Sequence, residues 1–258
     1  MQWRLIALTI AVLTGVLFAA CGGGGSNTST SGRIPFTCEA IREISSYRYT
    51  IHVQLDIPEA PAADGTPSED YGLGAFAPAL FGLLHDLEIE GAFVAPDRSQ
   101  AVLQAGTDEV EIRSVSGKSW VRYGDVWRDE GASDRELLLS PDTICSEMVP
   151  GLGQALAGLK YKTKIINGIT THHYHLDETD TRRLAGLLDS PNSEGDLPKR
   201  FILDIWLAED GGWPVQVQLT VVDEDENDRP TAVNVSMKFW DINSRDIEIE
   251  PPETVRQT

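Results

Sequence analysis

Residues 201–243 alternate apolar and polar side chains over three consecutive runs, and this stretch constrains the fold more than any other part of the sequence. A period of two is typical of antiparallel strands with one buried and one solvated face. Glycines within residues 209–212 suit a tight turn after the first run, and residues 223–229 form a charged turn after the second. The sequence therefore predicts a three-stranded meander, which the rest of the chain must extend and cover.

Further alternating runs precede the meander, at residues 47–57, 87–93, 100–104, 109–115, 119–123, 160–166 and 170–176. Asn167-Gly168, between the last two runs, is the strongest short signal for a β-hairpin. After the meander, the spacing of Ile247 and Ile249 predicts a final edge strand.

Helical patterns cover three short stretches, residues 38–44, 140–159 and 179–188. So many strands with so few helical residues do not fit a flat sheet. We therefore predict a mainly β (α+β) fold, in which a curled antiparallel sheet forms an incomplete barrel and short helices cover its concave face.

Residues 1–20 have the layout of a lipoprotein signal peptide. Arg4 precedes an apolar run that is too short for a transmembrane helix, and Ala19 and Ala20 stand directly before Cys21. In such signals the cysteine thiol is acylated before cleavage, so Cys21 is the predicted lipidation site, with palmitate as a typical acyl group. The alternative is a soluble secreted protein that is cut near Ala20.

A segment rich in Gly, Ser and Thr follows Cys21 and is expected to be a flexible tether. The chain therefore divides into a signal peptide (1–20), a lipidated cysteine with its tether (21–34) and one folded domain (35–258). Two or more acyl chains attach a protein stably to a membrane. We expect the domain to be anchored at the cell membrane on the extracytoplasmic side, on the outer face of the cytoplasmic membrane or in the periplasm.

The chain is strongly acidic, with 21 Lys and Arg against 40 Asp and Glu and a formal net charge of −19. Cleavage after Ala20 removes Arg4 and no acidic residue, which leaves 20 basic against 40 acidic residues and a net charge of −20. Binding of nucleic-acid phosphates requires a basic face, so nucleic acid is excluded as a partner.

Cys38 and Cys145 remain once Cys21 is lipidated, and each lies on the apolar stripe of a short amphipathic segment. In an oxidising compartment we predict that they form a disulfide between two covering helices. The alternative is two separate buried thiols, because spacing alone does not show that two cysteines meet.

Two groups of residues have partial metal-ligand spacing. His173 and His175 share one face of a predicted strand but lack a third zinc ligand, so solvated strand histidines are favoured. Asp223, Asp225 and Asn227 match the start of a calcium loop without its glycine and final glutamate, so a charged turn is favoured. We expect no metal and no cofactor.

Motifs of catalysis are also missing from the sequence. It has no Gly-x-Ser-x-Gly elbow, no metalloprotease helix motif and no phosphate-binding loop motif. We therefore expect no catalytic residues and no enzymatic activity.

An apolar wall is expected on the inner side of the meander, where the middle positions Leu203, Ile205, Val217 and Val235 are the candidate ligand contacts. Residues 71–84 are apolar but are interrupted by glycines and Pro78, and they predict a flap that contributes Leu80, Phe81 and Leu84. The alternative is a loop that simply packs on the core.

The order of these parts resembles the bacterial LppX/LprG-type lipoproteins, which share the fold of the lipoprotein carriers LolA and LolB. The resemblance covers residues 38–252 and is carried by residues 91–98, 167–169 leading to Tyr174, 206–214 and 249–252. It implies a hydrophobic cavity that holds a lipid or acyl chain for lipid transport or sensing, and it supplies no catalytic residues. The alternative function is an interaction or envelope-signalling module whose groove binds an apolar segment of an envelope protein. We expect a monomer in either case.

The lipid anchor is directly testable. Replacing Cys21 by Ser removes the acylated thiol, so we expect the Cys21→Ser protein to leave the membrane fraction after cell lysis, as measured by fractionation and immunoblotting. A variant that still sedimented wholly with membranes would place the anchor elsewhere in the chain.

Overall fold

A single antiparallel sheet of eleven strands holds most of the residues that the computed structural model describes. The structure describes residues 36–56, 86–105, 108–131, 139–148, 152–153, 156, 159–180, 200–224 and 230–253. The strands are β1 (Ser46–Asp56), β2 (Asp86–Val94), β3 (Arg98–Ala105), β4 (Asp108–Val115), β5 (Lys118–Tyr123), β6 (Val126–Gly131), β7 (Lys162–Ile166), β8 (Ile169–Leu176), β9 (Arg200–Ala208), β10 (Pro214–Glu224) and β11 (Pro230–Trp240).

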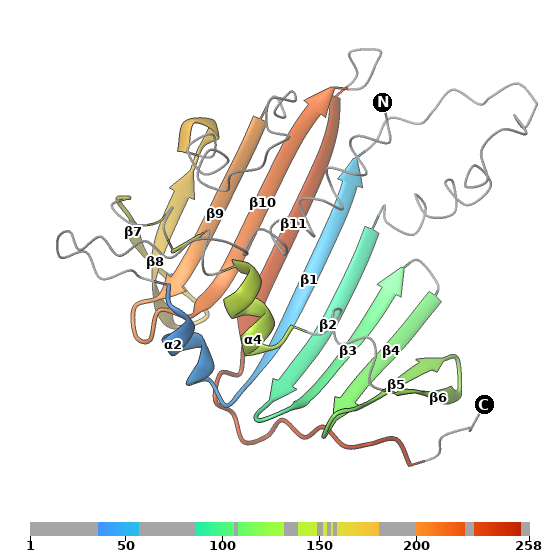
Figure 1. Cartoon of the computed structure of the whole chain (residues 1–258). Helices are drawn as coiled ribbons and strands as arrows, with labels where there is room; N and C mark the ends of the chain where they lie inside the picture. Colours follow the sequence, from blue (N-terminus) through green and yellow to red (C-terminus); the bar gives the residue numbers. More distant parts are fainter. Residues whose placement is uncertain are drawn as a thin grey trace, which may run out of the picture.

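Their order across the sheet is β6-β5-β4-β3-β2-β1-β11-β10-β9-β8-β7 (Figure 1). Within the described part of the chain β6 and β7 are the two edges, so the sheet is not closed into a barrel. The predicted fold class, mainly β with an open antiparallel sheet and few short helices, is confirmed.

The predicted turns have the backbone geometry that their residues suggest. Asn167 and Gly168 have positive φ values of 51° and 80° and connect β7 to β8 in a tight hairpin. Gly211 and Gly212, with φ values of 82° and 64°, stand in the turn between β9 and β10. Glycine and asparagine tolerate this left-handed region at little steric cost. The meander of residues 201–243 is therefore confirmed as β9, β10 and β11.

Short helices lie over one face of the sheet, near β9, β10 and β11 in Figure 1. They are α2 (Cys38–Arg42), α4 (Pro141–Thr143) and the π-helical turn η2 (Ile144–Met148). The hydroxyl oxygens of Thr37 and Ser140 accept hydrogen bonds from backbone N–H groups of the first turns of α2 and α4, as expected for helix N-caps. The two predicted covering segments therefore begin where the sequence suggests.

One sequence prediction about the C-terminal part is wrong. Ile247 and Ile249 do not form an edge strand; they are buried, with exposed fractions of 6% and 2%, against Ala92 of β2. After β11 the positions beside it are occupied by β1 and β10, so no edge is available there for another strand. The extended tail packs across the sheet instead, and its alternation reflects burial of every second residue without ladder pairing.

β6 has no counterpart among the strands that the sequence predicts. This edge strand contains only two apolar residues, Val126 and Trp127, before a charged run, so it lacks the alternation of a half-buried strand.

Several other predictions fall outside the described residues. These are Cys21 with the signal peptide and tether, the flap residues Leu80, Phe81 and Leu84, and part of the charged turn with Asp225 and Asn227. Of the helix predicted at 179–188, the structure describes only a turn at 178–180. Within the described ranges, no helix combines the length and the apolar composition that spanning a bilayer requires.

Close packing at Gly91 gives a stability prediction. A Cβ atom at this position would overlap the ring of its cross-strand partner Tyr49, which is fully buried. We expect Gly91→Ala to lower the free energy of unfolding by about 1–3 kcal/mol, the usual cost of overpacking, in urea denaturation.

A double-mutant cycle provides the control for this prediction. Because the clash requires the Tyr49 ring, Gly91→Ala should cost less in a Tyr49→Leu background than in the wild-type protein. Equal costs in both backgrounds would contradict the packing described at Gly91.

Candidate functional site

The inner face, defined here as the face of the sheet on which α2, α4 and η2 pack, carries continuous apolar rows of cross-strand neighbours, and two adjacent rows run through its middle strands. The central row crosses eight strands and consists of Val110, Leu103, Ile89, Ile51, Met237, Val217, Ile205 and Tyr174. The second row crosses six strands and consists of Leu87, Val53, Val235, Leu219, Leu203 and Leu176. Neither row contains a charged side chain, so both rows favour apolar contacts.

Burial changes along these rows. At the β8–β9 end Ile205, Tyr174 and Leu176 are almost fully buried. Toward the middle strands a group of apolar side chains is only half-buried and is interspersed with the buried Ile89 and Val53. We call this group the half-buried patch: Val110, Leu103, Leu87, Ile51, Met237, Val235 and Leu219. Covering large apolar side chains lowers the free energy, so this patch is the part of the inner face best suited to bind an apolar ligand.

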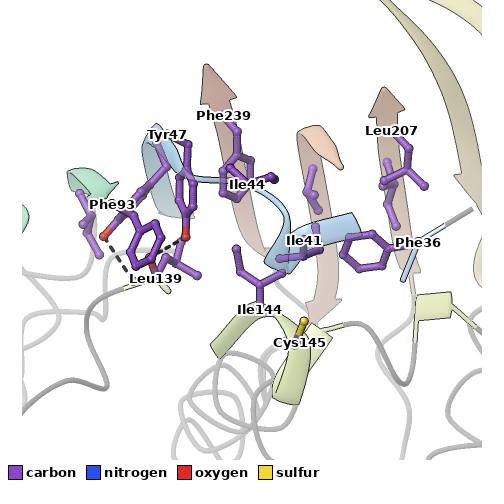
Figure 2. Packing of buried hydrophobic residues seen from close by; sticks show 14 of the residues in the cluster. Phe36, Ile41, Ile44, Tyr47, Phe93, Leu139, Ile144, Cys145, Leu207 and Phe239 are labelled. Atoms are coloured by element: carbon purple, nitrogen blue, oxygen red, sulfur yellow. Dashed lines mark hydrogen bonds between the residues drawn. The ribbon is translucent and has the colours of Figure 1, made fainter. Parts of the chain in front are cut away.

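Next to this patch the inner face is closed by aromatic side chains. Tyr47 stacks on Phe93 with ring centroids 5.4 Å apart and meets Phe239 edge-on at 5.9 Å (Figure 2). Contacts of this kind contribute about 0.5–1.5 kcal/mol beyond area burial. The alternating pattern predicts strands at these residues, but it does not indicate that their rings fill the inner face.

Two hydrogen bonds fix the segment before α4 to this aromatic group. The Tyr47 hydroxyl donates to the Leu139 carbonyl at 2.8 Å, and the Leu139 N–H donates to the Tyr49 hydroxyl at 3.4 Å (Figure 2). Burial raises the pKa of Tyr49 to about 12 and raises the pKa of Tyr47 well above its usual value, so both hydroxyls remain protonated. At this end of the inner face the buried tyrosine hydroxyls are therefore hydrogen-bonded within the protein core.

The predicted wall residues all lie on the inner face, as neighbouring members of the two rows on β9, β10 and β11. Leu203, Ile205 and Val217 are at most 8% exposed and belong to the same core cluster as the helices. Val235 instead belongs to the half-buried patch. The structure thus brings the four residues together, and their contact with a ligand stays a prediction.

Cys38 and Cys145 come together where α2 meets η2. Each sulfur lies 3.5 Å from the backbone carbonyl oxygen of the other cysteine, and both are free thiols in the structure. Burial, with the adjacent Cys38 thiol, raises the pKa of Cys145 to about 12. The disulfide stays a prediction, supported by this proximity.

The histidines singled out in the sequence lie on the opposite, outer face of the sheet. His173 Nε2 and His175 Nδ1 lie 2.6 Å and 2.9 Å from the same oxygen of Asp204, and the His173 ring stacks on Trp206 at 4.4 Å. His175 is solvated as expected, whereas His173 is largely buried. The described residues contain no cluster of three or more side chains suited to a metal ion.

The protonation states of this group follow from burial and hydrogen bonding. Burial lowers the pKa of His173 despite the opposing contact with Asp204. Partial burial opposes ionisation of Asp204, but hydrogen bonds with His175 and His173 lower its pKa overall. The arrangement is a neutral His173 hydrogen-bonded to an ionised carboxylate, which is a structural contact on the outer face.

Comparison with known proteins supplies little beyond this geometry. No protein-family model and no curated protein matches the chain. Among solved structures the chain is similar to a chain of the Pseudomonas aeruginosa MucA/MucB complex, with 12% sequence identity and a TM-score of 0.31. The match covers 81% of this chain and 56% of that chain, so this chain spans little more than half of its length. Such values do not support an inference about function, and membership of the LppX/LprG-type family stays a prediction.

The proximity of the two cysteines gives a redox prediction. In protein purified from an oxidising compartment with Cys21 replaced by Ser, titration of the denatured, unreduced chain should find no free thiol. Closing a loop of this length contributes about 4–5 kcal/mol in the chain-entropy model, so reduction should lower the denaturation midpoint. Two titratable thiols per chain would end the disulfide hypothesis.

Proposed function

We propose that this protein is a non-enzymatic binding protein of the cell envelope, anchored through Cys21 on the extracytoplasmic side, which binds an apolar ligand on its inner face. The half-buried patch supports this proposal, because it groups neighbouring apolar side chains of β1 to β4, β10 and β11 in rows without a charged side chain. The expected absence of catalytic residues agrees with binding as the activity.

An acyl chain is the first ligand that suits such a surface. Each buried CH₂ group contributes about 0.8 kcal/mol, so one long chain is held without a charged contact. In this version the protein transports or senses lipid near the membrane to which it is anchored. Val235, Met237 and Leu219 are the residues that we expect to contact the chain.

An apolar segment of an envelope protein is the second candidate. Three of the four predicted wall residues, Leu203, Ile205 and Val217, already pack against the protein's own core. Their burial favours a ligand that covers the half-buried patch over one that is enclosed deep beneath the helices. In this version the protein is an interaction or signalling module of the envelope.

Substitutions on β11 test the role of the inner face. Val235 is half-buried on this face, so Val235→Trp should cover part of the patch without overfilling the core. We expect this variant to bind the fluorescent fatty acid cis-parinaric acid about tenfold more weakly, the loss of roughly two buried CH₂ groups. The matched control is Ser236→Trp, which places the same side chain on the outer face and should leave binding unchanged.

Native mass spectrometry separates the two ligands. Cys21→Ser protein from a bacterial host should retain lipid if the protein is a carrier. Absence of both retained lipid and fatty-acid binding would reject the lipid version and leave the interaction module. A protein partner whose crosslinks mapped away from the inner face would reject that version too.

A further inference from the structure

We propose that β7 is a docking strand for an extended, alternating acidic and apolar segment of a partner protein, which adds to the sheet as a further strand. β7 is the last strand of the sheet in the described part of the chain, and four of its five residues are exposed. Ile165 is 73% exposed and the preceding Tyr161 is 49% exposed. An exposed edge strand with apolar side chains is a typical template for pairing with another chain.

The backbone of β7 has hydrogen-bonding groups on its open side. The Lys164 carbonyl accepts a hydrogen bond from the Thr171 hydroxyl at 2.9 Å, so the backbone groups of Lys164 face β8. Because these groups alternate in direction along a strand, the N–H and C=O groups of Thr163 and Ile165 face away from β8. An added strand would pair with these two residues.

The two faces of β7 differ in chemistry. Register with β8 places Lys162 and Lys164 on the outer face and Thr163 and Ile165 on the inner face. The ammonium nitrogen of Lys164 lies 5.7 Å from the centre of the Trp206 ring, which confirms its outward direction. A strand that pairs here would place every second side chain beside lysines and the others beside apolar groups.

No described carboxylate forms an ion pair with Lys162 or Lys164. Asp204, an acidic residue of β9 on the outer face, is hydrogen-bonded to His173 and His175 instead. In a chain with a net charge of −19, the outer face of β7 thus presents two lysine ammonium groups without a described ion-pair partner. Charge complementarity selects Asp and Glu for the outer-face positions of the partner segment.

Tyr161 is held in place as an apolar anchor on the inner side of the edge. Its ring stacks on His172 at 4.0 Å and lies 5.6 Å from Tyr174. A ring that is already oriented loses little conformational freedom on binding. Apolar side chains of the partner segment would contact Tyr161 and Ile165.

The same lysines make a second copy of this chain an unsuitable occupant. Antiparallel pairing of β7 with β7 would bring the lysine rows of two copies together on one face, and like charges in cross-strand pairs are destabilising. The carboxylates of an acidic strand would instead attract the lysine ammonium groups. The edge thus discriminates between self-pairing and an acidic partner.

The test uses Cys21→Ser protein and two labelled peptides of equal composition. One peptide alternates, Glu-Val-Asp-Tyr-Glu-Val-Asp, and the other groups the same acidic and apolar residues into blocks. We expect fluorescence anisotropy to show binding of the alternating peptide and at least about tenfold weaker binding of the block peptide. Hydrogen exchange should show slower exchange at Thr163 and Ile165 in the alternating complex.

Two pairs of protein variants separate the backbone from the charge contribution. Thr163→Pro removes the outward N–H group and should weaken binding about five- to tenfold, whereas Thr163→Val keeps this group and should not. Lys162→Glu with Lys164→Glu should weaken binding at least about tenfold at low salt. The matched control, Lys118→Glu with Lys238→Glu, changes the net charge equally at exposed positions away from β7 and should have little effect.

The proposal is overturned if the wild-type protein does not bind the alternating peptide, if both peptides bind equally, or if Thr163→Pro has no effect. Self-association that Thr163→Pro abolishes would identify a second copy as the occupant and would equally overturn it. The test is independent of the inner face, because Val235→Trp should leave peptide binding unchanged and the β7 variants should leave fatty-acid binding unchanged.

Discussion

The pairing of β1 with β11 is the interaction on which the rest of the structure depends. β1 to β6 form one meander and β7 to β11 form another, and the pairing of Arg48–Asp56 with Ala232–Trp240 joins them. These strands come from opposite ends of the described chain, so pairing them costs more loop-closure entropy than forming a local hairpin does. The central row continues from one half to the other only because Ile51 meets Met237 at this join. Without it the inner face would be two smaller surfaces with two additional edges.

The two faces of the joined sheet are covered in different ways. On the inner face Ile41 of α2 and Ile144 of η2 are buried in the same core cluster as the aromatic residues of β1 and β11. On the outer face the C-terminal tail buries Ile247 and Ile249, and its start is bonded to the beginning of β1 through Asn243, whose side-chain oxygen accepts from the Ser45 N–H at 2.7 Å. The helices and the tail thus cover opposite faces of the sheet and are both hydrogen-bonded near the beginning of β1, and the half-buried patch lies on the inner face.

Local pattern predicted the strands well where one face is buried and poorly where it is not. Alternation located β1 and the final meander, and Asn167-Gly168 located the hairpin, because these signals depend on neighbouring residues only. The pattern does not predict β6, because β6 is a charged edge strand. It wrongly predicts a strand in the tail with Ile249, because burial of alternate residues does not require ladder pairing. The period of two also indicates that Leu203 and Val217 face inward, but it does not indicate that other side chains of the protein cover them. Whether an inward side chain meets a helix or a ligand depends on contacts between distant segments, which no local pattern encodes.

Openness of the sheet leaves two edges with unlike chemistry, and the β7 edge is continuous with the inner face. The central row ends at Tyr174 on β8, and Tyr161 lies beside that residue at the start of β7. A strand added at β7 would therefore extend the apolar surface by one further position while placing its acidic side chains on the outer face beside Lys162 and Lys164. A closed barrel would have neither property, because closure removes the edges and encloses the inner face. The incomplete closure of the sheet is thus the feature on which both proposed binding surfaces, the half-buried patch and the β7 edge, depend.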